Sequence, residues 1–345
     1  MKNKVNDRMD DKMKATYVTK YNKNNIKVEL VNIDKPAIGE RDVLVRVRAA
    51  GVNPLDNMIS RGEVKMIVPY KLPLVAGNEF VGIVEEVGAR VSNFKVNDRV
   101  FARLPLDRIG AFAEYVSVDE NALAIVPDYL SDIEAAAVPL TALTIMQALD
   151  LMKAKPGETI FISGGTGSVG AMAIPIAKAK GLEVITNGSV ENKERVIELG
   201  ASRFIDYKTE DYTKTLSNID HVLDTLGGNE TEKQMSILKK GGKLVSLRAM
   251  PNGAFAKRMN LPKWKQIILG IAGRKFDKLA EKYGVKYDFI FVESNGRQLE
   301  EVAEIFESLR IKPSVDTVYD FEDVNKALDK VANGRSRGKT IIKMV

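Results

Sequence analysis

Three glycines at phosphate-binding spacing carry the clearest chemistry in this sequence. Gly165, Gly167 and Gly170 follow the apolar stretch 159–163 in the pattern G-x-G-x-x-G. This spacing supplies a tight turn, a close approach of the backbone to phosphate, and close packing of a helix on a strand. The amides that open the following helix then face the anion. Because a loop that only joins a strand to a helix can carry the same glycines, the flanking elements must decide.

The flanking sequence favours a dinucleotide site. The pattern predicts a strand over 159–163, a helix over 171–180 and a second strand over 181–186, which together form a βαβ unit. We therefore expect the connecting loop to bind a dinucleotide pyrophosphate. The predicted contacts in the loop are Gly164, Gly165, Thr166, Gly167, Ser168, Val169 and Gly170.

The end of the second strand favours NADPH over NADH. An NADH site normally places an acidic residue there to bind the ribose 2′-hydroxyl, whereas this chain has Asn187, Gly188 and Ser189. The Ser189 hydroxyl can hydrogen-bond a 2′-phosphate and Lys193 can neutralise it, so Gly188, Ser189 and Lys193 are predicted NADP(H) contacts. The alternative is a solvated helix start, in which Ser189 caps a helix over 190–199 and Lys193 lies on its exposed face.

Length and composition suit an enzyme of ordinary size. The 345 residues, 45% of them apolar, can form sizeable cores in about two domains. Without an apolar run of about 18 residues or an apolar signal core, we expect no membrane span and a cytoplasmic location. The chain has no cysteine and a single histidine, His221, so the usual thiolate and His-cluster metal sites are excluded and we expect no metal.

The net charge of +6 does not by itself indicate nucleic-acid binding, because the basic residues are scattered among 46 acidic ones. The segment 257–286 is locally basic, with nine Lys and Arg against two carboxylates (9 − 2 = +7) and Trp264 and several isoleucines interleaved. Such a segment could bind a membrane surface, an acidic partner or RNA. The commoner explanation is a lid, in which long basic stems coat a helix whose apolar face is buried.

The chain divides into parts of different pattern, which predict an α/β fold class. Residues 1–12 are polar and are expected to form a flexible tail, and 13–133 contain short alternating strands typical of a β-barrel-like domain. Strands and helices alternate over 134–287, as in a doubly wound parallel sheet. The last part, 288–345, adds an apolar strand predicted at 289–292.

Six further segments occur in an order that is specific to one protein family. They are Gly51-Val52-Asn53-Pro54-Leu55-Asp56, 77–88 (GNEFVGIVEEVG), 137–144 (AVPLTALT), 198–201 (ELGA), 205–207 (IDY) and 334–339 (GRSRGK). From Met13 to Val345 the chain thereby resembles the medium-chain dehydrogenase/reductase superfamily, in its zinc-independent quinone oxidoreductase branch. Where the zinc alcohol dehydrogenases of that family carry a histidine ligand, this chain has Asn78.

The resemblance implies a Rossmann domain, which is a doubly wound parallel sheet, beside a GroES-like β-barrel catalytic domain completed by 288–345. It also implies NADPH-dependent hydride transfer, without metal, to an electrophilic small molecule such as a quinone or an α,β-unsaturated carbonyl. Asn53 and Asp56 would be the catalytic residues, although both Asn53 and Asn78 also suit plain turn positions. The cofactor contacts that it adds are Thr141, Tyr207, Thr225, Gly227, Phe291 and Val292. The strand at 289–292 would pair across a two-fold axis in a homodimer.

One residue departs from the family pattern. Many quinone oxidoreductases carry a tyrosine, as a possible proton donor, where this chain has Met58. A thioether cannot donate a proton, so we expect protonation from water or a cofactor hydroxyl. Two alternatives to the quinone or enone reductase stay open, namely a zinc-free carbonyl reductase and an NADPH-binding regulatory protein that binds a partner through 257–286.

Overall fold

The computed structural model describes residues 12–24, 26–334 and 338–344, and the chain forms two compact units. The first unit contains Met1–Leu143 and Glu293–Val345, and the second contains Thr144–Val292. The predicted domain boundaries at 133/134 and 287/288 fall earlier in the chain. Of the predicted tail 1–12, only Lys12 belongs to the described residues, and it begins the first strand.

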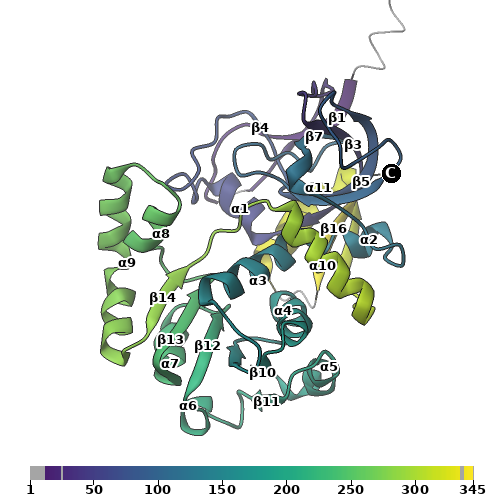
Figure 1. The fold of residues 1–345 in the computed structure, drawn as a ribbon. Helices are drawn as coiled ribbons and strands as arrows, with labels where there is room; N and C mark the ends of the chain where they lie inside the picture. The colour runs from purple at the N-terminus through teal and green to yellow at the C-terminus, as the bar shows by residue number, and fades with distance from the viewer. Residues whose placement is uncertain (1–11, 25, 335–337, 345) are drawn as a thin grey trace, which may run out of the picture. The chain divides into compact units, whose positions relative to one another are not determined.

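The first unit is rich in antiparallel strands (Figure 1). Within the described residues, seven strands form one sheet, in the order β15-β16-β3-β5-β6-β8 with β7 on β3, and three form a second, β2-β1-β4. The strands are β1 Lys12–Val18, β2 Glu29–Asp34, β3 Asp42–Val52, β4 Leu74–Val75, β5 Glu79–Val87, β6 Arg99–Arg103, β7 Tyr115–Asp119, β8 Leu123–Ile125, β15 Val315–Asp320 and β16 Lys339–Lys343. The helices are α1 Pro54–Arg61, α2 Asp132–Ala135, α10 Gly296–Leu309 and α11 Val324–Asn333, with 3-10 turns η1 Glu120–Ala122 and η3 Phe321–Asp323.

Strand β3 organises this unit because it is long enough to pair with three neighbours. Its first half pairs with β7, its last residues pair with β16, and β5 runs along its other edge. Val45 and Val47 are buried in the core, whereas Arg46 and Arg48, which alternate with them, are partly exposed. This is the two-residue period of a half-buried strand. The register brings the end of β3 beside the starts of β5 and β16.

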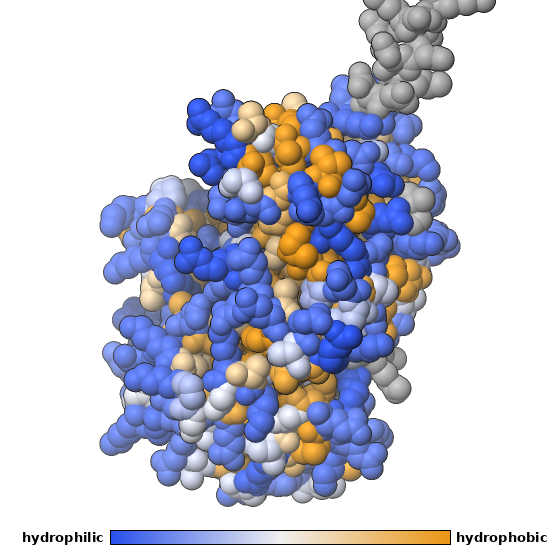
Figure 2. All heavy atoms as spheres, turned by 45° about the vertical axis from the view of Figure 1, so that its right-hand side comes forward, coloured by the Kyte–Doolittle hydropathy of each residue, from blue (hydrophilic) through white to orange (hydrophobic). Residues whose placement is uncertain are grey.

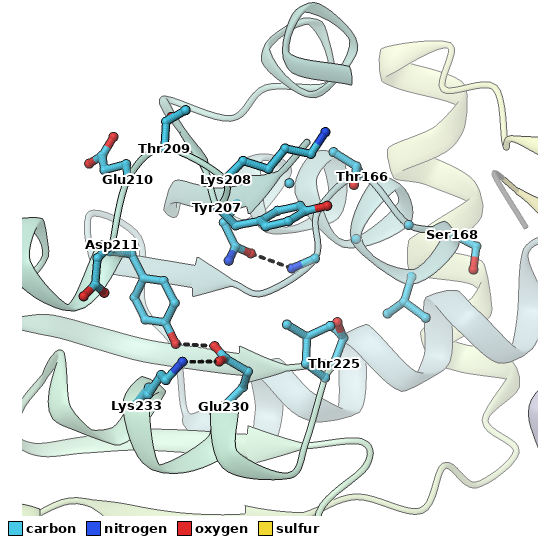
Figure 3. A pocket seen from close by; sticks show the side chains of 18 residues that line it. Thr166, Ser168, Tyr207, Lys208, Thr209, Glu210, Asp211, Thr225, Glu230 and Lys233 are labelled. Atoms are coloured by element: carbon cyan, nitrogen blue, oxygen red, sulfur yellow. Dashed lines mark hydrogen bonds and ion pairs between the residues drawn. The ribbon is translucent and has the colours of Figure 1, made fainter. Parts of the chain in front are cut away.

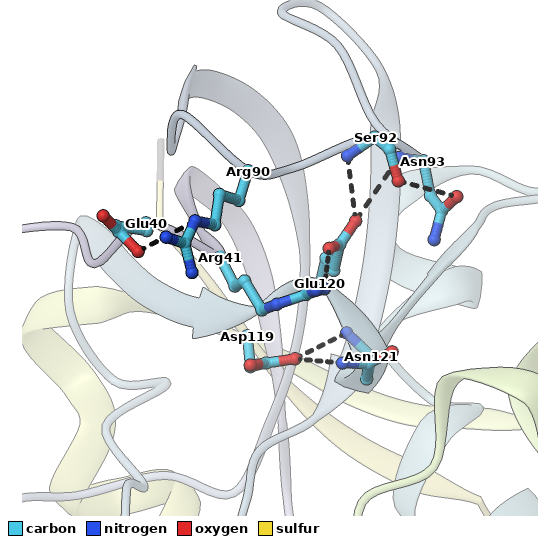
Figure 4. Close-up of polar contacts among 8 residues, drawn as sticks. All are labelled: Glu40, Arg41, Arg90, Ser92, Asn93, Asp119, Glu120 and Asn121. Carbon is cyan, nitrogen blue, oxygen red and sulfur yellow. Dashed lines mark hydrogen bonds and ion pairs between the residues drawn. The ribbon is translucent and has the colours of Figure 1, made fainter.

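A buried carboxylate ties two loops of this unit together (Figure 4). Glu120 accepts hydrogen bonds from the backbone amides of Ser92 and Asn93 at 3.1 and 3.3 Å, and pairs with Arg41 at 3.1 Å. The Glu120 side chain is 1% exposed, whereas that of Arg41 is 59% exposed. The two amides therefore anchor this carboxylate more firmly than the solvent-facing ion pair does.

The second unit is a parallel sheet in the order β11-β10-β9-β12-β13-β14. Its strands are β9 Thr159–Ile162, β10 Glu183–Gly188, β11 Arg203–Asp206, β12 Ile219–Asp224, β13 Leu238–Ser246 and β14 Lys286–Phe289. Its helices are α4 Ser168–Ala179, α5 Lys193–Glu198, α6 Tyr212–Thr215, α7 Asn229–Ser236, α8 Gly253–Arg258 and α9 Lys263–Tyr283, with the 3-10 turn η2 Val190–Asn192. Helix α3 Pro139–Met152 crosses from the first unit into the second. The predicted α/β fold class, with a doubly wound parallel sheet, is confirmed.

The strand predicted at 289–292 is wrong, because the strand that forms is β14, Lys286–Phe289. In β14 the residues Tyr287 and Phe289 are buried, and the polar residues before each of them are not. This alternation fits the edge of the sheet, where β14 pairs with β13. The continuous apolar run that suggested a strand begins only as the strand ends.

Among the described residues, one stretch is long and apolar enough to cross a membrane by length and composition. It is Asp132–Met152, which covers α2 and α3, and 72% of its most apolar window is buried within the fold. This burial is that of a core helix. Figure 2 shows that hydrophilic side chains cover most of the face in view, with apolar side chains between them, as on ordinary protein surfaces.

Candidate active site

A cavity of ≈ 880 Å³ opens at the carboxyl ends of the central strands of the second unit (Figure 3). Its walls come from the loops that follow β9, β10, β11 and β12. The sheet order reverses between β9 and β12, and doubly wound sheets bind ligands at such a point. In Figure 3, Tyr207 and Lys208 lie on one side of the cavity, and Thr225 and Glu230 lie on the other.

Three glycines allow this cavity to form, because a side chain at any of them would collide with a neighbour. A Cβ on Gly165 would lie 1.9 Å from the Thr186 hydroxyl oxygen, and one on Gly170 would lie 2.3 Å from the Gly165 Cα. A Cβ on Gly188 would lie 2.2 Å from the Thr166 methyl carbon. The loop, α4 and β10 therefore pack as closely as the sequence pattern predicts.

The start of α4 presents free amides to the cavity. The N-cap residue of this helix is Gly167, so no side chain caps it, and the amides of its first turn have no partner within the helix. Asn187 holds the loop in place, since its side-chain oxygen accepts from the Gly164 amide at 2.8 Å and its carbonyl accepts from the Gly165 amide at 3.0 Å. An uncapped helix start with glycine walls fits the pyrophosphate of a dinucleotide.

Of the three contacts predicted at the end of β10, Gly188 lines the cavity, whereas Ser189 and Lys193 do not. The Ser189 hydroxyl instead donates to the Glu191 carboxylate, and this bond, with a Lys208 contact at 3.2 Å, lowers the Glu191 pKa to about 2. Lys193 begins α5, away from the lining residues. The cations that do line the cavity are Lys233, which pairs with Glu230 at 2.7 Å, and Lys208. The sequence offered a signal for it, since Lys208 follows the matched segment 205–207 directly.

The remaining predicted cofactor residues divide into two groups. Those that line the cavity are Gly164, Thr166, Gly167, Ser168, Val169, Gly170, Gly188, Tyr207 and Thr225. Those that do not are Thr141, Gly165, Ser189, Lys193, Gly227, Phe291 and Val292. Gly227 forms a turn with φ +70° whose amide donates to Asp224, and Phe291 and Val292 follow β14 rather than lying in a strand.

A second polar site lies buried in the first unit, where β3 ends. Its members are Asn53, Asp56, Asn78, Glu79, Thr141 and Lys339, all of them buried. Asn53 is the N-cap of α1, Glu79 begins β5 and Lys339 begins β16. Thr340 pairs with Val52 across the strands, and this register sets Lys339 beside Asn53.

Every polar atom of Asn53 is engaged. Its backbone amide donates to Asp56 Oδ2 at 2.7 Å, its side-chain nitrogen donates to Glu79 Oε1 at 2.8 Å, and its side-chain oxygen accepts from Lys339 at 2.6 Å. These are the contacts of a structural turn that begins a helix. The catalytic roles of Asn53 and Asp56 stay predictions.

Glu79 and Lys339 form a fully buried ion pair, which the sequence reasoning did not identify as part of the site. Lys339 Nζ lies 2.5 Å from Glu79 Oε1 and also donates to the Thr141 hydroxyl at 3.2 Å. The second Glu79 oxygen accepts from the backbone amide of Leu140 at 2.7 Å. The sequence did contain a signal for this pair, because Glu79 lies in the matched segment 77–88 and Lys339 in the matched segment 334–339. Residues 335–337 of the second segment fall outside the described residues.

Asp56 is an acid with an unusual environment. Its pKa is raised from 3.8 to about 6, because burial, helped by the Glu79 charge, outweighs the hydrogen bonds from Asn78 and Asn53 and the Lys339 charge. The Asn78 side-chain nitrogen donates to Asp56 Oδ1 at 2.7 Å, so both Asp56 oxygens accept. Asn78 therefore serves to hold Asp56 in place.

Arg103 and Tyr70, in the same unit, carry buried donor atoms that lack partners within the described residues. Arg103 lies opposite Glu79 in the β5–β6 ladder, and its Nη1 donates to the Leu104 carbonyl. Its Nε and Nη2, and the Tyr70 hydroxyl, find no partner among the residues that the structure describes. Burial lowers the Arg103 pKa to about 10 and raises the Tyr70 pKa to about 12, with Arg103 and Asp56 acting on Tyr70 in opposite directions. Tyr70 is thus a protonated hydroxyl that the sequence reasoning missed.

His221 and the carboxylates are placed differently from metal ligands. The His221 ring contacts Glu158 at 2.8 Å, at the end of the sheet opposite the cavity. Over residues 12–24, 26–334 and 338–344, no three His, Cys, Asp or Glu side chains gather into a group that could hold a metal ion.

Two family descriptions match the chain. The alcohol dehydrogenase GroES-like domain matches residues 39–128, and the zinc-binding dehydrogenase family matches residues 199–342. Together they cover segments of both units. The name of the second family includes zinc. This chain has no cysteine and a single histidine that could serve as ligands to such a metal.

Several relatives along nearly the whole chain are named as oxidoreductases or reductases. The mitochondrial NAD(P)H oxidoreductase RTN4IP1 of Danio rerio is 33% identical, over 96% of this chain and 92% of the relative. The chloroplastic NADPH-dependent alkenal/one oxidoreductase of Arabidopsis thaliana is 30% identical, over 90% and 74%. Among solved structures, the quinone oxidoreductase from Coxiella burnetii superposes with a TM-score of 0.81 at 26% identity, over 97% of this chain and all of that one.

The raised Asp56 pKa predicts a pH-dependent stability. A carboxyl that binds its proton more tightly when folded stabilises the fold fully below its unfolded pKa of 3.8 and loses that contribution as pH rises through about 6. The wild type should therefore lose about 3 kcal/mol relative to Asp56→Asn between about pH 4 and about pH 7.5. The variant keeps an acceptor for the Asn53 amide, and Asn78 can turn its unpartnered oxygen toward the new amide.

Urea unfolding of both proteins across this range measures the difference. Parallel pH curves for wild type and Asp56→Asn would show that Asp56 keeps an ordinary pKa.

Proposed function

Because the chain belongs to the medium-chain dehydrogenase/reductase superfamily, in its branch of quinone oxidoreductases and alkenal reductases, we propose that it uses NADPH to reduce quinones or α,β-unsaturated carbonyls. The observation that supports this most directly is the glycine-walled cavity, whose uncapped α4 suits a dinucleotide. NADPH supplies a hydride when bound. The protein's part is to bind and orient the two reactants.

The chemistry of the chain favours electron-poor acceptors. With no cysteine and one histidine, it is short of the soft ligands that a catalytic zinc prefers. An acceptor that is activated by hydrogen bonds alone reacts best when it is already electron-poor, as quinones and conjugated carbonyls are. This favours the quinone or enone reductase over a reductase of ordinary carbonyls.

The Tyr70 hydroxyl is the best-placed donor for the acceptor oxygen. Met58 cannot donate a proton, whereas the Tyr70 hydroxyl is buried, protonated and without a partner in the described chain. It is also close enough to Asp56 and Arg103 for both to act on its pKa. The nearby Arg103 cation would stabilise negative charge on an oxygen that Tyr70 contacts. Tyr70 therefore takes the place that the sequence reasoning gave to water or a cofactor hydroxyl.

A preference for NADPH over NADH rests on Lys208. It lines the cavity beside Tyr207, at the end of β11, and the tip of β10 carries no carboxylate for a ribose 2′-hydroxyl. A lysine at this place can neutralise a 2′-phosphate. Lys208 thus joins Ser189 and Lys193 as a candidate.

The other expectations remain part of the proposal. The free edge of β14 is where a second copy would pair in a homodimer. The cytoplasmic location is still a prediction, since the names of the two relatives place those proteins in mitochondria and chloroplasts. An NADPH-binding regulatory protein is the alternative if no acceptor is turned over.

The reductase activity is tested by offering the protein, treated with a chelator, a 2-alkenal and an ortho-quinone. We expect NADPH consumption, followed by absorbance, with at least one acceptor and with NADPH preferred over NADH. Tight NADPH binding without turnover of any acceptor would favour the regulatory protein instead.

Lys208→Ala should weaken NADPH binding selectively. Loss of a charge-assisted contact to phosphate should raise the KM for NADPH by about ten- to a hundredfold and leave that for NADH unchanged. Lys193→Ala is the matched variant for the site predicted from sequence. Steady-state kinetics with both cofactors decide between the two lysines, and variants that affect NADPH and NADH alike would refute recognition of a 2′-phosphate.

Tyr70→Phe should lower kcat by about a hundredfold if Tyr70 donates to the acceptor. Its hydroxyl has no partner within the described chain, so the variant should unfold at the same urea concentration as the wild type. Met58→Leu is the matched control and should keep its kcat. An unchanged kcat in Tyr70→Phe, or a large loss in Met58→Leu, contradicts this assignment.

A further inference from the structure

Helix α9 carries an apolar stripe that faces away from the fold. Trp264, Ile267, Ile268 and Ile271 are 54%, 64%, 46% and 70% exposed. Their spacing of i, i+3, i+4 and i+7 puts all four on one face of the helix. Single exposed apolar side chains are ordinary, but four adjacent ones on one helix mark an interaction surface.

The opposite side of α9 packs against the fold, so the helix is held with this stripe outward. Leu269, Gly273 and Ala280 are buried, and a Cβ on Gly273 would lie 2.5 Å from the Cβ of Asn252, the N-cap of α8. Asn252 also donates to Asp277 at 2.6 Å. Figure 1 shows α8 and α9 side by side, with β14 next to them.

The same outward face continues into a row of cations. Arg274, Lys275 and Lys278 follow Ile271 at helical spacing and are exposed. Neither Arg274 nor Lys278 forms an ion pair with any carboxylate in the described part of the chain, whereas Lys282, one turn further on, pairs with Glu232 at 3.0 Å. The face therefore has an apolar half and a positively charged half, in which Arg274 and Lys278 have no carboxylate partner among the described residues.

We propose that this face of α9, from Trp264 to Lys278, docks on an anionic lipid surface. Large apolar side chains enter the boundary between headgroups and acyl chains, and Trp is well suited to that depth. Lys and Arg on the same face pair with anionic headgroups. Both halves of the face are thus matched by one occupant.

A second copy of the chain matches this face poorly. A two-fold axis along the helix would set the cations of one copy against those of the other. An axis across the helix would set cations against isoleucines. Both arrangements leave charge unpaired at the contact, which interfaces avoid.

The chain contains its own probe, because Trp264 is its single tryptophan. We expect the fluorescence of the full-length protein to shift to shorter wavelength with vesicles of phosphatidylcholine and phosphatidylserine, and to be quenched when those lipids carry bromine in their acyl chains. Phosphatidylcholine alone should give a much smaller shift, and added salt should reverse the effect. No shift with the anionic vesicles, or equal shifts with both kinds, overturns the proposal.

Variants separate the two halves of the face. Vesicle co-sedimentation should be lost in Ile267→Ser/Ile271→Ser and in Arg274→Glu/Lys278→Glu, and kept in Leu309→Ser, a change at a 52% exposed leucine of α10 in the other unit. Thermal unfolding midpoints should match the wild type. Retained sedimentation in both α9 variants overturns the proposal. The proposal is also overturned if light scattering shows that the wild type is a dimer and that Ile267→Ser/Ile271→Ser is a monomer. Either failure leaves the reductase activity untouched.

Discussion

The buried pair of Glu79 and Lys339 is the constraint on which the first unit depends. A charge buried without a partner costs several kcal/mol, so the fold tolerates this carboxylate only where the ammonium reaches it. The two residues are far apart in sequence, and their contact requires β16 to close beside β3 while β5 begins at the same place. Asn53 and the Leu140 amide donate hydrogen bonds to Glu79, and Thr141 accepts one from Lys339. The N-terminal ends of α1 and α3 are thereby both held at this ion pair.

The second unit obeys a constraint of the opposite kind, since its site depends on glycines, which carry no side chain. Gly165, Gly170 and Gly188 leave room that a single carbon atom would fill. The result is a loop and a helix start whose amides are free because the backbone is packed closely elsewhere. One unit is thus specified by polar groups that must be paired, and the other by the absence of side-chain volume.

This difference explains what the sequence could predict. The glycine loop, the βαβ unit and the strand β11 are local, and their spacing alone predicts them. Six of the seven loop residues from Gly164 to Gly170 line the cavity as predicted, all but Gly165. Lys339, Arg103 and Tyr70 belong to the site through strand register and burial, which one sequence does not display. Lys208 was missed because Lys193 offers the same charge at a plausible place in the sequence, just after β10. The strand at 289–292 failed because hydrophobicity without alternation does not locate an edge strand.

Helix α9 shows how burial separates two explanations that sequence leaves equal. Basic stems that coat a helix with a buried apolar face account for Leu269 and Ala280, which pack inward. They do not account for Trp264 and Ile271, which lie on the other side of the same helix and are more than half exposed. A helix of 21 residues with apolar residues on both sides has more apolar surface than its own domain covers. Arg274 and Lys278, which pair with no carboxylate in the described part of the chain, continue that second stripe. The occupant that we propose is therefore apolar and anionic together, as a lipid headgroup layer is.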